Sequence, residues 1–131
     1  MKKESIAIEI NENRKNVTLK YELDPPKMVL EVDEKISIAE GRSLIHCLAS
    51  LREQNPHIKF LCKGSKLNVY FSRMSMQMSS GMLAYELTLG EYALIKDIVN
   101  IFDYDDSNIA QSFEQQKAFF ETWLESLEQG Q

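Results

Sequence analysis

The stretch IAIEINENRKNVTLKYEL, residues 6–23, decides the fold. Apolar side chains occupy every second position of residues 6–10 and again of residues 17–23, which is the period of a β-strand with one buried face. The polar residues 11–16 between the two runs are typical of a turn. The stretch therefore predicts a β-hairpin.

Strand patterns continue after this hairpin. Asp24-Pro25-Pro26 ends the second strand, because proline has no N–H for the strand ladder and restrains the residue before it. Alternating apolar residues at 28–32 predict a third strand. The same alternation at 58–62 and 67–71 predicts a second hairpin, and residues 82–89 predict a further strand.

Helical spacing and capping patterns predict three helices. Ser37-Ile38-Ala39-Glu40 has the S-x-x-E form of a capping box, and the apolar residues behind it predict a helix over residues 39–53. Thr88-Leu89-Gly90-Glu91 has a similar form and precedes a second predicted helix, which includes the apolar residues 94–102. The third predicted helix covers residues 107–128.

The order β-β-β-α-β-β-β-α-α groups strands in runs instead of alternating them singly with helices. This order predicts a single α+β domain over residues 1–131, with a largely antiparallel sheet of about six strands, one central helix and two C-terminal helices. A free strand edge at residues 6–10 or 82–89 is one place where a partner strand could pair.

The composition is that of a water-soluble globular protein, with 44% hydrophobic and 27% charged residues. Residues 1–12 lack the apolar core of a signal peptide, and no apolar run approaches the ~20 residues of a membrane span. We therefore expect a cytoplasmic protein with no membrane association. In that compartment Cys47 and Cys62 are expected to be buried thiols, with a disulfide or a metal pair as the weaker alternatives.

No motif of a known catalytic or cofactor site occurs in the chain. There is no glycine-rich phosphate loop, no G-x-S-x-G, no H-E-x-x-H and no zinc-type Cys/His spacing, so His46 is interpreted as structural. The acidic stretch 103–106 lacks the glycine and the closing glutamate of a calcium loop. We therefore expect a protein that is not an enzyme and needs no metal or cofactor.

Four methionines, Met74, Met76, Met78 and Met82, lie close together in the chain. The first three occupy alternate positions and would share one face of an extended segment. Core packing, an adaptable surface for a partner and a Cu(I) site are the three interpretations of this cluster.

The segment 59–73 combines basic and aromatic residues, as a single-stranded nucleic-acid surface does. Part of it resembles a strand of the RNA-recognition motif, with Ser65 and Leu67 in place of the stacking aromatic residues. Phe60 and Phe71 are expected to face the core, and the sequence pI is about 5.1. Nucleic acid is therefore only an alternative partner.

The C-terminal third of the chain is strongly acidic. Residues 82–131 contain ten acidic and two basic side chains, whereas residues 37–81 contain two acidic and six basic ones. Such a surface attracts a cationic macromolecule, although carboxylates that merely solvate the helices explain it as well. The candidate partner-binding residues are Asp97, Asp103, Tyr104, Asp105, Asp106, Glu114, Glu121 and Glu125.

In its small size, acidity and lack of catalytic motifs, the chain resembles the small bacterial toxin-immunity proteins. This resemblance implies a non-enzymatic inhibitor, or antitoxin, that neutralises a basic partner such as a toxin nuclease by covering its active site; it implies no particular fold or residue. The alternative is a bacterial secretion chaperone, which would show an exposed apolar surface and form a dimer.

Overall fold

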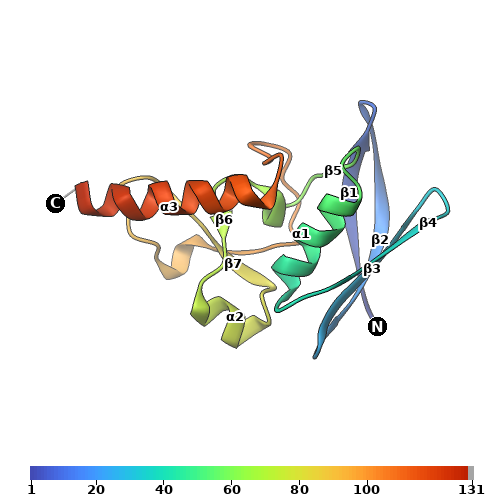
Figure 1. The fold of residues 1–131 in the computed structure, drawn as a ribbon, viewed down its shortest axis with the longest axis horizontal. Helices are drawn as coiled ribbons and strands as arrows, with labels where there is room; N and C mark the ends of the chain where they lie inside the picture. The colour runs from blue at the N-terminus through green and yellow to red at the C-terminus, as the bar shows by residue number, and fades with distance from the viewer. Residues whose placement is uncertain (130–131) are drawn as a thin grey trace.

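The computed structural model describes residues 1–129 and contains two antiparallel sheets and three α-helices. The larger sheet has the order β4-β3-β2-β1-β5 and is strongly twisted (Figure 1). Its first four strands form a continuous meander, and the short fifth strand pairs with the first. The strands are β1 (Lys2–Ile10), β2 (Asn13–Leu23), β3 (Pro26–Val32), β4 (Lys35–Glu40) and β5 (Lys59–Phe60).

Helix α1 (Leu44–Gln54) covers the inner face of this sheet. Leu44, Leu48 and Leu51 are fully buried on the helix, and Ile8 and Leu19 are buried on the sheet. These side chains form one apolar core, so the alternation in β1 and β2 and the helical spacing in α1 describe two sides of the same contact.

The second half of the chain forms the smaller sheet and the remaining helices. Its strands have the order β6-β7-β8, with α3 lying beside them (Figure 1). Two isolated bridges, Cys62 with Tyr104 and Lys66 with Ile109, connect its early and late segments. The elements are η1 (Lys63–Ser65), β6 (Val69–Tyr70), α2 (Arg73–Ser79), β7 (Leu83–Glu86), η2 (Ile95–Asp97), β8 (Ile98–Asn100) and α3 (Phe113–Gln129).

The structure confirms the single α+β domain and the hairpin over residues 6–23, in which Ile6 pairs with Val17. The prediction of one sheet with about six strands is wrong, because the eight strands within residues 1–129 are divided between a five-stranded and a three-stranded sheet. The free strand edges expected at 6–10 and 82–89 are wrong as well. β1 has β5 beside it at Ile8 and Glu9, and β7 lies between β6 and β8.

The capping box predicted at Ser37–Glu40 is wrong, because these residues belong to β4. Asp33 and Glu34 have positive φ angles of 50° and 70° and form a two-residue turn that pairs Val32 with Lys35. Ser37 and Ala39 face the core, each 3% exposed. The helix therefore begins at Leu44 instead of 39.

The second predicted hairpin, formed by residues 58–62 and 67–71, is also wrong. Lys59–Phe60 joins the larger sheet through β1, whereas Val69–Tyr70 joins the smaller sheet through β7. The intervening residues form the 3-10 turn η1, which packs against α1. The two segments are neighbours in the chain but edges of different sheets.

The helix predicted through residues 94–102 does not form. Asp97 accepts a hydrogen bond from the backbone of Leu94 and closes the short turn η2, after which Ile98–Asn100 pairs with β7. Leu94 is 53% exposed and Ile95 is 86% exposed. The apolar spacing that predicted a buried helix therefore belongs to an exposed turn followed by a strand.

The last helix begins at Phe113, later than the predicted residue 107. Asp105 accepts hydrogen bonds from the backbone and hydroxyl of Ser107, and Asn108 has a φ of 57°, so this stretch is a turn. Ser112 then accepts a hydrogen bond from the Gln115 backbone and caps the helix. No helix within residues 1–129 is long and apolar enough to cross a membrane.

Gly64 is required where η1 meets α1. A Cβ atom at this position would lie 2.6 Å from Leu48 Cδ2 and 2.8 Å from Ile101 Cβ. We expect Gly64→Ala to lower the free energy of unfolding by about 3 kcal/mol through overpacking, measured by urea denaturation.

Gly90→Ala is the control for that substitution. Gly90 has a φ of 80°, and a Cβ added there would meet no atom within 4 Å, so only backbone strain of about 1 kcal/mol is expected. A Gly64→Ala protein as stable as the Gly90→Ala protein would contradict the close contact of η1 with α1.

Candidate functional site

Helix α3 is held to the body of the protein by its inner face. Trp123 packs with Tyr70 and Leu87 in a second apolar cluster, and its Nε1–H donates to the Glu91 carbonyl at 2.9 Å. The Ser126 hydroxyl accepts from the Gly90 backbone at 2.8 Å. With this face buried, the opposite face of the helix is presented outward, away from the larger sheet (Figure 1).

The first turns of α3 are anchored by Gln116, whose side chain is fully buried. Its Nε2 donates to the carbonyls of Gly64, Lys66 and Val69 at 3.0, 2.8 and 3.1 Å. Its Oε1 accepts from the Arg52 guanidinium at 2.6 Å. A single amide therefore joins α3, α1 and the 64–69 segment.

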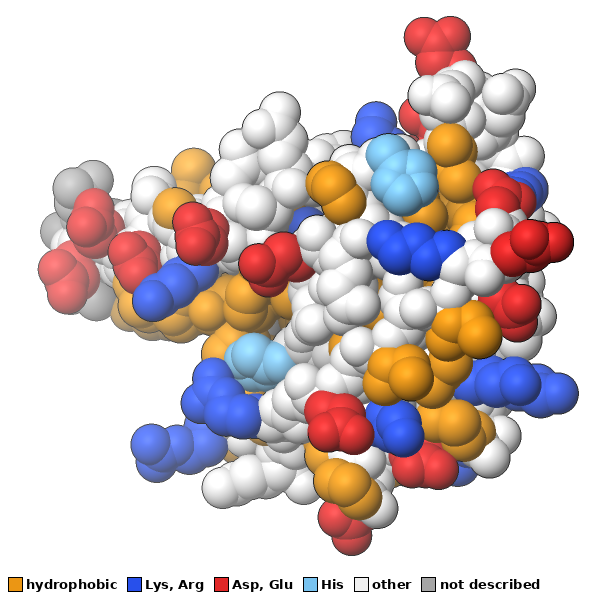
Figure 2. Space-filling view, turned by 45° about the vertical axis from the view of Figure 1, so that its right-hand side comes forward, with side chains coloured by type: hydrophobic (Ala, Val, Ile, Leu, Met, Phe, Trp, Pro, Cys, Tyr) orange, Lys and Arg blue, Asp and Glu red, His pale blue; other side chains and the backbone are white. Residues whose placement is uncertain are grey.

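The outer face of α3 has a row of carboxylates that we call the α3 acidic row. Spacings of seven, four and three residues place its members on one side of the helix. Figure 2 shows acidic side chains gathered along this helix, with one basic side chain among them. All four are exposed, and none forms an ion pair with any residue among 1–129. The row consists of Glu114, Glu121, Glu125 and Glu128.

Three of the sequence-predicted site residues, Glu114, Glu121 and Glu125, thus lie together. The row extends about 20 Å along the helix axis. Glu128 belongs to the same row, although the predicted set omits it. Its helical spacing from Glu121 and Glu125 was the signal that could have included it.

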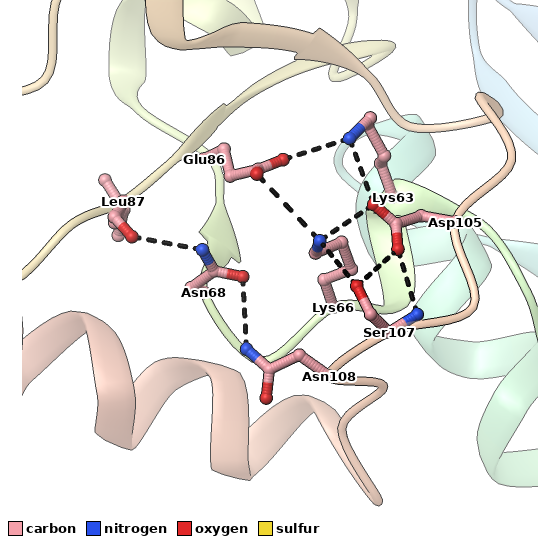
Figure 3. Close-up of polar contacts among 8 residues, drawn as sticks. All are labelled: Lys63, Lys66, Asn68, Glu86, Leu87, Asp105, Ser107 and Asn108. Atoms are coloured by element: carbon pink, nitrogen blue, oxygen red, sulfur yellow. Dashed lines mark hydrogen bonds and ion pairs between the residues drawn. The ribbon is translucent and has the colours of Figure 1, made fainter.

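Asp105, by contrast, lies inside a network of charges within the protein (Figure 3). Its Oδ2 is 2.8 Å from Lys66 Nζ and 3.1 Å from Lys63 Nζ, and Glu86 lies 3.2 Å from Lys63. Lys66 and the Ser107 backbone hold the pKa of Asp105 well below its ordinary value. Through Lys63 and Lys66, the two carboxylates connect η1 and the residue after it with β7 and the 103–108 segment.

Asp106 and Tyr104 also have partners within the chain. Arg14 in β2 donates to Asp106 at 2.9 Å, to the Tyr104 hydroxyl at 3.0 Å and to Glu9 at 3.0 Å. The Arg14 hydrogen bond lowers the pKa of Asp106. These contacts connect the first hairpin to the 103–108 segment, so the charge of Asp106 is partly compensated.

The remaining predicted residues, Asp97 and Asp103, do not belong to α3. Asp97 is occupied with the η2 turn through its bond to the Leu94 backbone, and Asp103 is exposed just after β8. The structure therefore separates the eight predicted residues into four groups. Three lie in the α3 acidic row, Asp105 lies in the network with Lys63 and Lys66, Tyr104 and Asp106 share the exposed Arg14, and Asp97 and Asp103 lie separately.

The basic and aromatic residues of 59–73 do not form a stacking surface. Lys63 and Lys66 point toward Glu86 and Asp105, while Phe60 and Tyr70 are buried. The hairpin that supported a nucleic-acid interface is therefore replaced by internal ion pairs and core contacts.

Three residues of the methionine cluster, Met74, Met76 and Met78, lie on a helix, and Met82 lies beyond its end. Residues 73–79 form α2, capped by reciprocal hydrogen bonds between Ser72 and Ser75, so alternate methionines do not share a face. Met74 and Met78, one turn apart, are exposed instead. The extended arrangement on which the Cu(I) interpretation depended is wrong.

Both cysteines are free and buried, as predicted. Burial raises the pKa of the Cys47 thiol to about 11, and burial also raises the pKa of Cys62. His46 Nε2 accepts a hydrogen bond from the Arg42 guanidinium, and its Nδ1 shares a hydrogen bond with the Ser43 hydroxyl. Its ring packs against Phe71 and Phe113. Burial lowers the pKa of this histidine, so it is neutral at pH 7.

Comparisons with known proteins give no relative: no family model and no curated protein matches this sequence. The candidate site therefore rests on geometry and charge alone.

We expect Asp105→Asn to lower the free energy of unfolding at pH 7 by about 2 kcal/mol, because it leaves two lysines facing a single carboxylate. The folded-state pKa of Asp105 is depressed, so its contribution is present above its unfolded pKa of about 4 and is lost as the pH falls below that value. Urea denaturation of the variant and the wild type between pH 7 and pH 2 measures this difference.

Asp103→Asn removes an exposed carboxylate from the same segment without removing an ion pair described within residues 1–129. Its stability should match the wild type at every pH to within about 0.5 kcal/mol. A constant difference between Asp105→Asn and wild type down to pH 2 would contradict the proposed contribution of the ion pairs.

Proposed function

We propose that this chain is a non-enzymatic protein-binding module that covers a cationic surface of another protein, as toxin-immunity proteins do. The observation that supports this function is the α3 acidic row, whose four carboxylates face outward without ion pairs among the described residues 1–129. The partner is a basic protein, with a toxin nuclease as the kind that the resemblance implies.

Charge repulsion within the row favours such a partner. Neighbouring carboxylates one turn apart on a helix destabilise it slightly, and Lys117 is the basic residue among them. Cations of a partner would relieve this repulsion. The field of the row also accelerates encounter with a cationic partner, most strongly at low ionic strength, where the Debye length exceeds its value of about 10 Å at 0.1 M salt.

An apolar anchor lies beside the row. Leu124 is 44% exposed, three residues after Glu121 and four before Glu128, so it adjoins both on the helix surface. Interfaces obtain most of their affinity from a few apolar or aromatic contacts surrounded by polar ones. We therefore propose that the α3 acidic row orients the partner and raises the rate of association, and that the contact of Leu124 with the partner contributes the affinity.

The exposed apolar turn over residues 89–98 supports a second candidate, the secretion chaperone. Leu89, Leu94 and Ile95 are all at least half exposed. A chaperone of this kind would use such a surface for a secreted substrate and would be an obligate dimer. Light scattering with size exclusion separates the two functions, since the primary proposal requires no dimer.

The double variant Glu121→Lys/Glu125→Lys tests the primary proposal. Proteins from the source cell that bind immobilised wild type are identified, and the association rate of each basic one is measured. We expect the variant to reduce that rate about 10-fold at low ionic strength, with a smaller effect at high salt.

Glu22→Lys/Glu31→Lys is the matched control, because it changes the net charge equally on exposed positions of β2 and β3. Its association rate should stay close to wild type. If both double variants slow association equally, or neither does, then net charge or another surface is responsible and α3 is not the binding site.

A further inference from the structure

An open cavity of about 930 Å³ lies between α1, β5 and the segment 109–114 that leads into α3. Its apolar wall includes Ala49, Phe60, Ile109 and Phe113. Its size is within the range of small-molecule sites, and Arg52 is a charged residue in its lining.

Within the described part of the chain, residues 1–129, the hydrogen-bond partners of Arg52 are neutral groups. Its guanidinium donates to Gln116 Oε1 at 2.6 Å and, weakly, to the Ala110 carbonyl at 3.4 Å. No carboxylate among residues 1–129 lies within 4.0 Å of it. The thiol of Cys62 is its ionisable neighbour, and burial keeps that thiol protonated.

Two lysines that are also shielded from water differ from Arg52, because they have carboxylate partners. Lys63 and Lys66, both largely buried, each contact Asp105 and Glu86. Burial lowers the pKa of Arg52, which is consistent with a half-buried guanidinium that has no carboxylate beside it among residues 1–129. Its place in the last turn of α1 supplies some compensation through the helix dipole, but no full negative charge.

We propose that this cavity binds a small monocarboxylate with an apolar body, whose carboxylate accepts hydrogen bonds from Arg52. A guanidinium has five N–H donors, and Gln116 and Ala110 accept from two of its nitrogens, so donors remain for a ligand. The apolar wall would hold the rest of the molecule. This site shares Glu114 with one end of the α3 acidic row. Its test uses small carboxylates and no protein partner, so it is independent of the proposed function.

The charge of the lining favours a monocarboxylate over a phosphate. The lining also contains Glu9, Glu53 and Glu114, against Lys59 as the second permanent cation. Lys59 already lies 4.0 Å from Glu9. A phosphate dianion would face a lining in which three carboxylates outnumber two permanent cations, whereas a single carboxylate needs only Arg52 as its partner.

Arg52 itself reports binding in the intact protein. The ¹⁵N–¹H signal of its Nε is followed by NMR during titration with hexanoate and benzoate, in parallel with hexanamide, benzamide and inorganic phosphate. We expect saturable shifts with the two carboxylates and an affinity at least about 10-fold weaker for the isosteric amides, which cannot form the charge-assisted pair. Phosphate should bind more weakly than the carboxylates.

Ala49→Phe tests the location, because the larger side chain fills the cavity and leaves Arg52 in place. Ala118→Phe, on the exposed surface of α3, is the matched control. The carboxylate shifts should disappear in the first variant and persist in the second. The proposal is overturned if neither carboxylate gives a saturable shift, if the amides bind as well, or if Ala49→Phe still binds.

Discussion

The side-chain amide of Gln116 is the interaction on which the arrangement of the second half of the protein depends. Fully buried, it donates to three carbonyls of the 64–69 segment and accepts from Arg52. Removing this amide would take away one buried hydrogen-bond partner from each of these three carbonyls, at a cost comparable with a lost hydrogen bond. The same amide thus sets where α3 leaves the body and which way the Arg52 guanidinium points. Both the α3 acidic row and the cavity depend on it.

Folding divides the acidic residues of the C-terminal third between two roles. Asp105 and Glu86 compensate the lysines of η1 and the segment after it, and Asp106 compensates Arg14 of the first hairpin. The opposite net charges of the middle and last thirds of the chain therefore serve, in part, to hold these segments together. The carboxylates of the α3 acidic row have no such ion pairs within residues 1–129 and face outward. This uncompensated negative charge is the basis for the proposed function, in which the protein acts by binding through its surface.

The periodicity of apolar residues predicted the strands and helices in which buried side chains recur at a regular spacing along the chain. The hairpin over residues 6–23 and the buried face of α1 were visible because each alternates at the period of its own geometry. β4 was missed because Ile36 and Ile38 face outward while small Ser37 and Ala39 face the core, which reverses the usual pattern. The partners of Asp105 lie about forty residues away, and no local pattern reports such a contact. The α3 acidic row, a property of one helix, was therefore predictable, whereas the internal network and the isolation of Arg52 were not.

The two isolated bridges, Cys62 with Tyr104 and Lys66 with Ile109, have a consequence for how the molecule is assembled during synthesis. The meander β1 to β4 needs only short-range pairing and can form while later residues are still being added. The inner side of η1 stays uncovered until Ile101 and its neighbours arrive, and α3 docks after that. A nascent chain halted before residue 101 would therefore leave exposed the side of η1 that Ile101 covers, and this interval in synthesis carries a risk of aggregation.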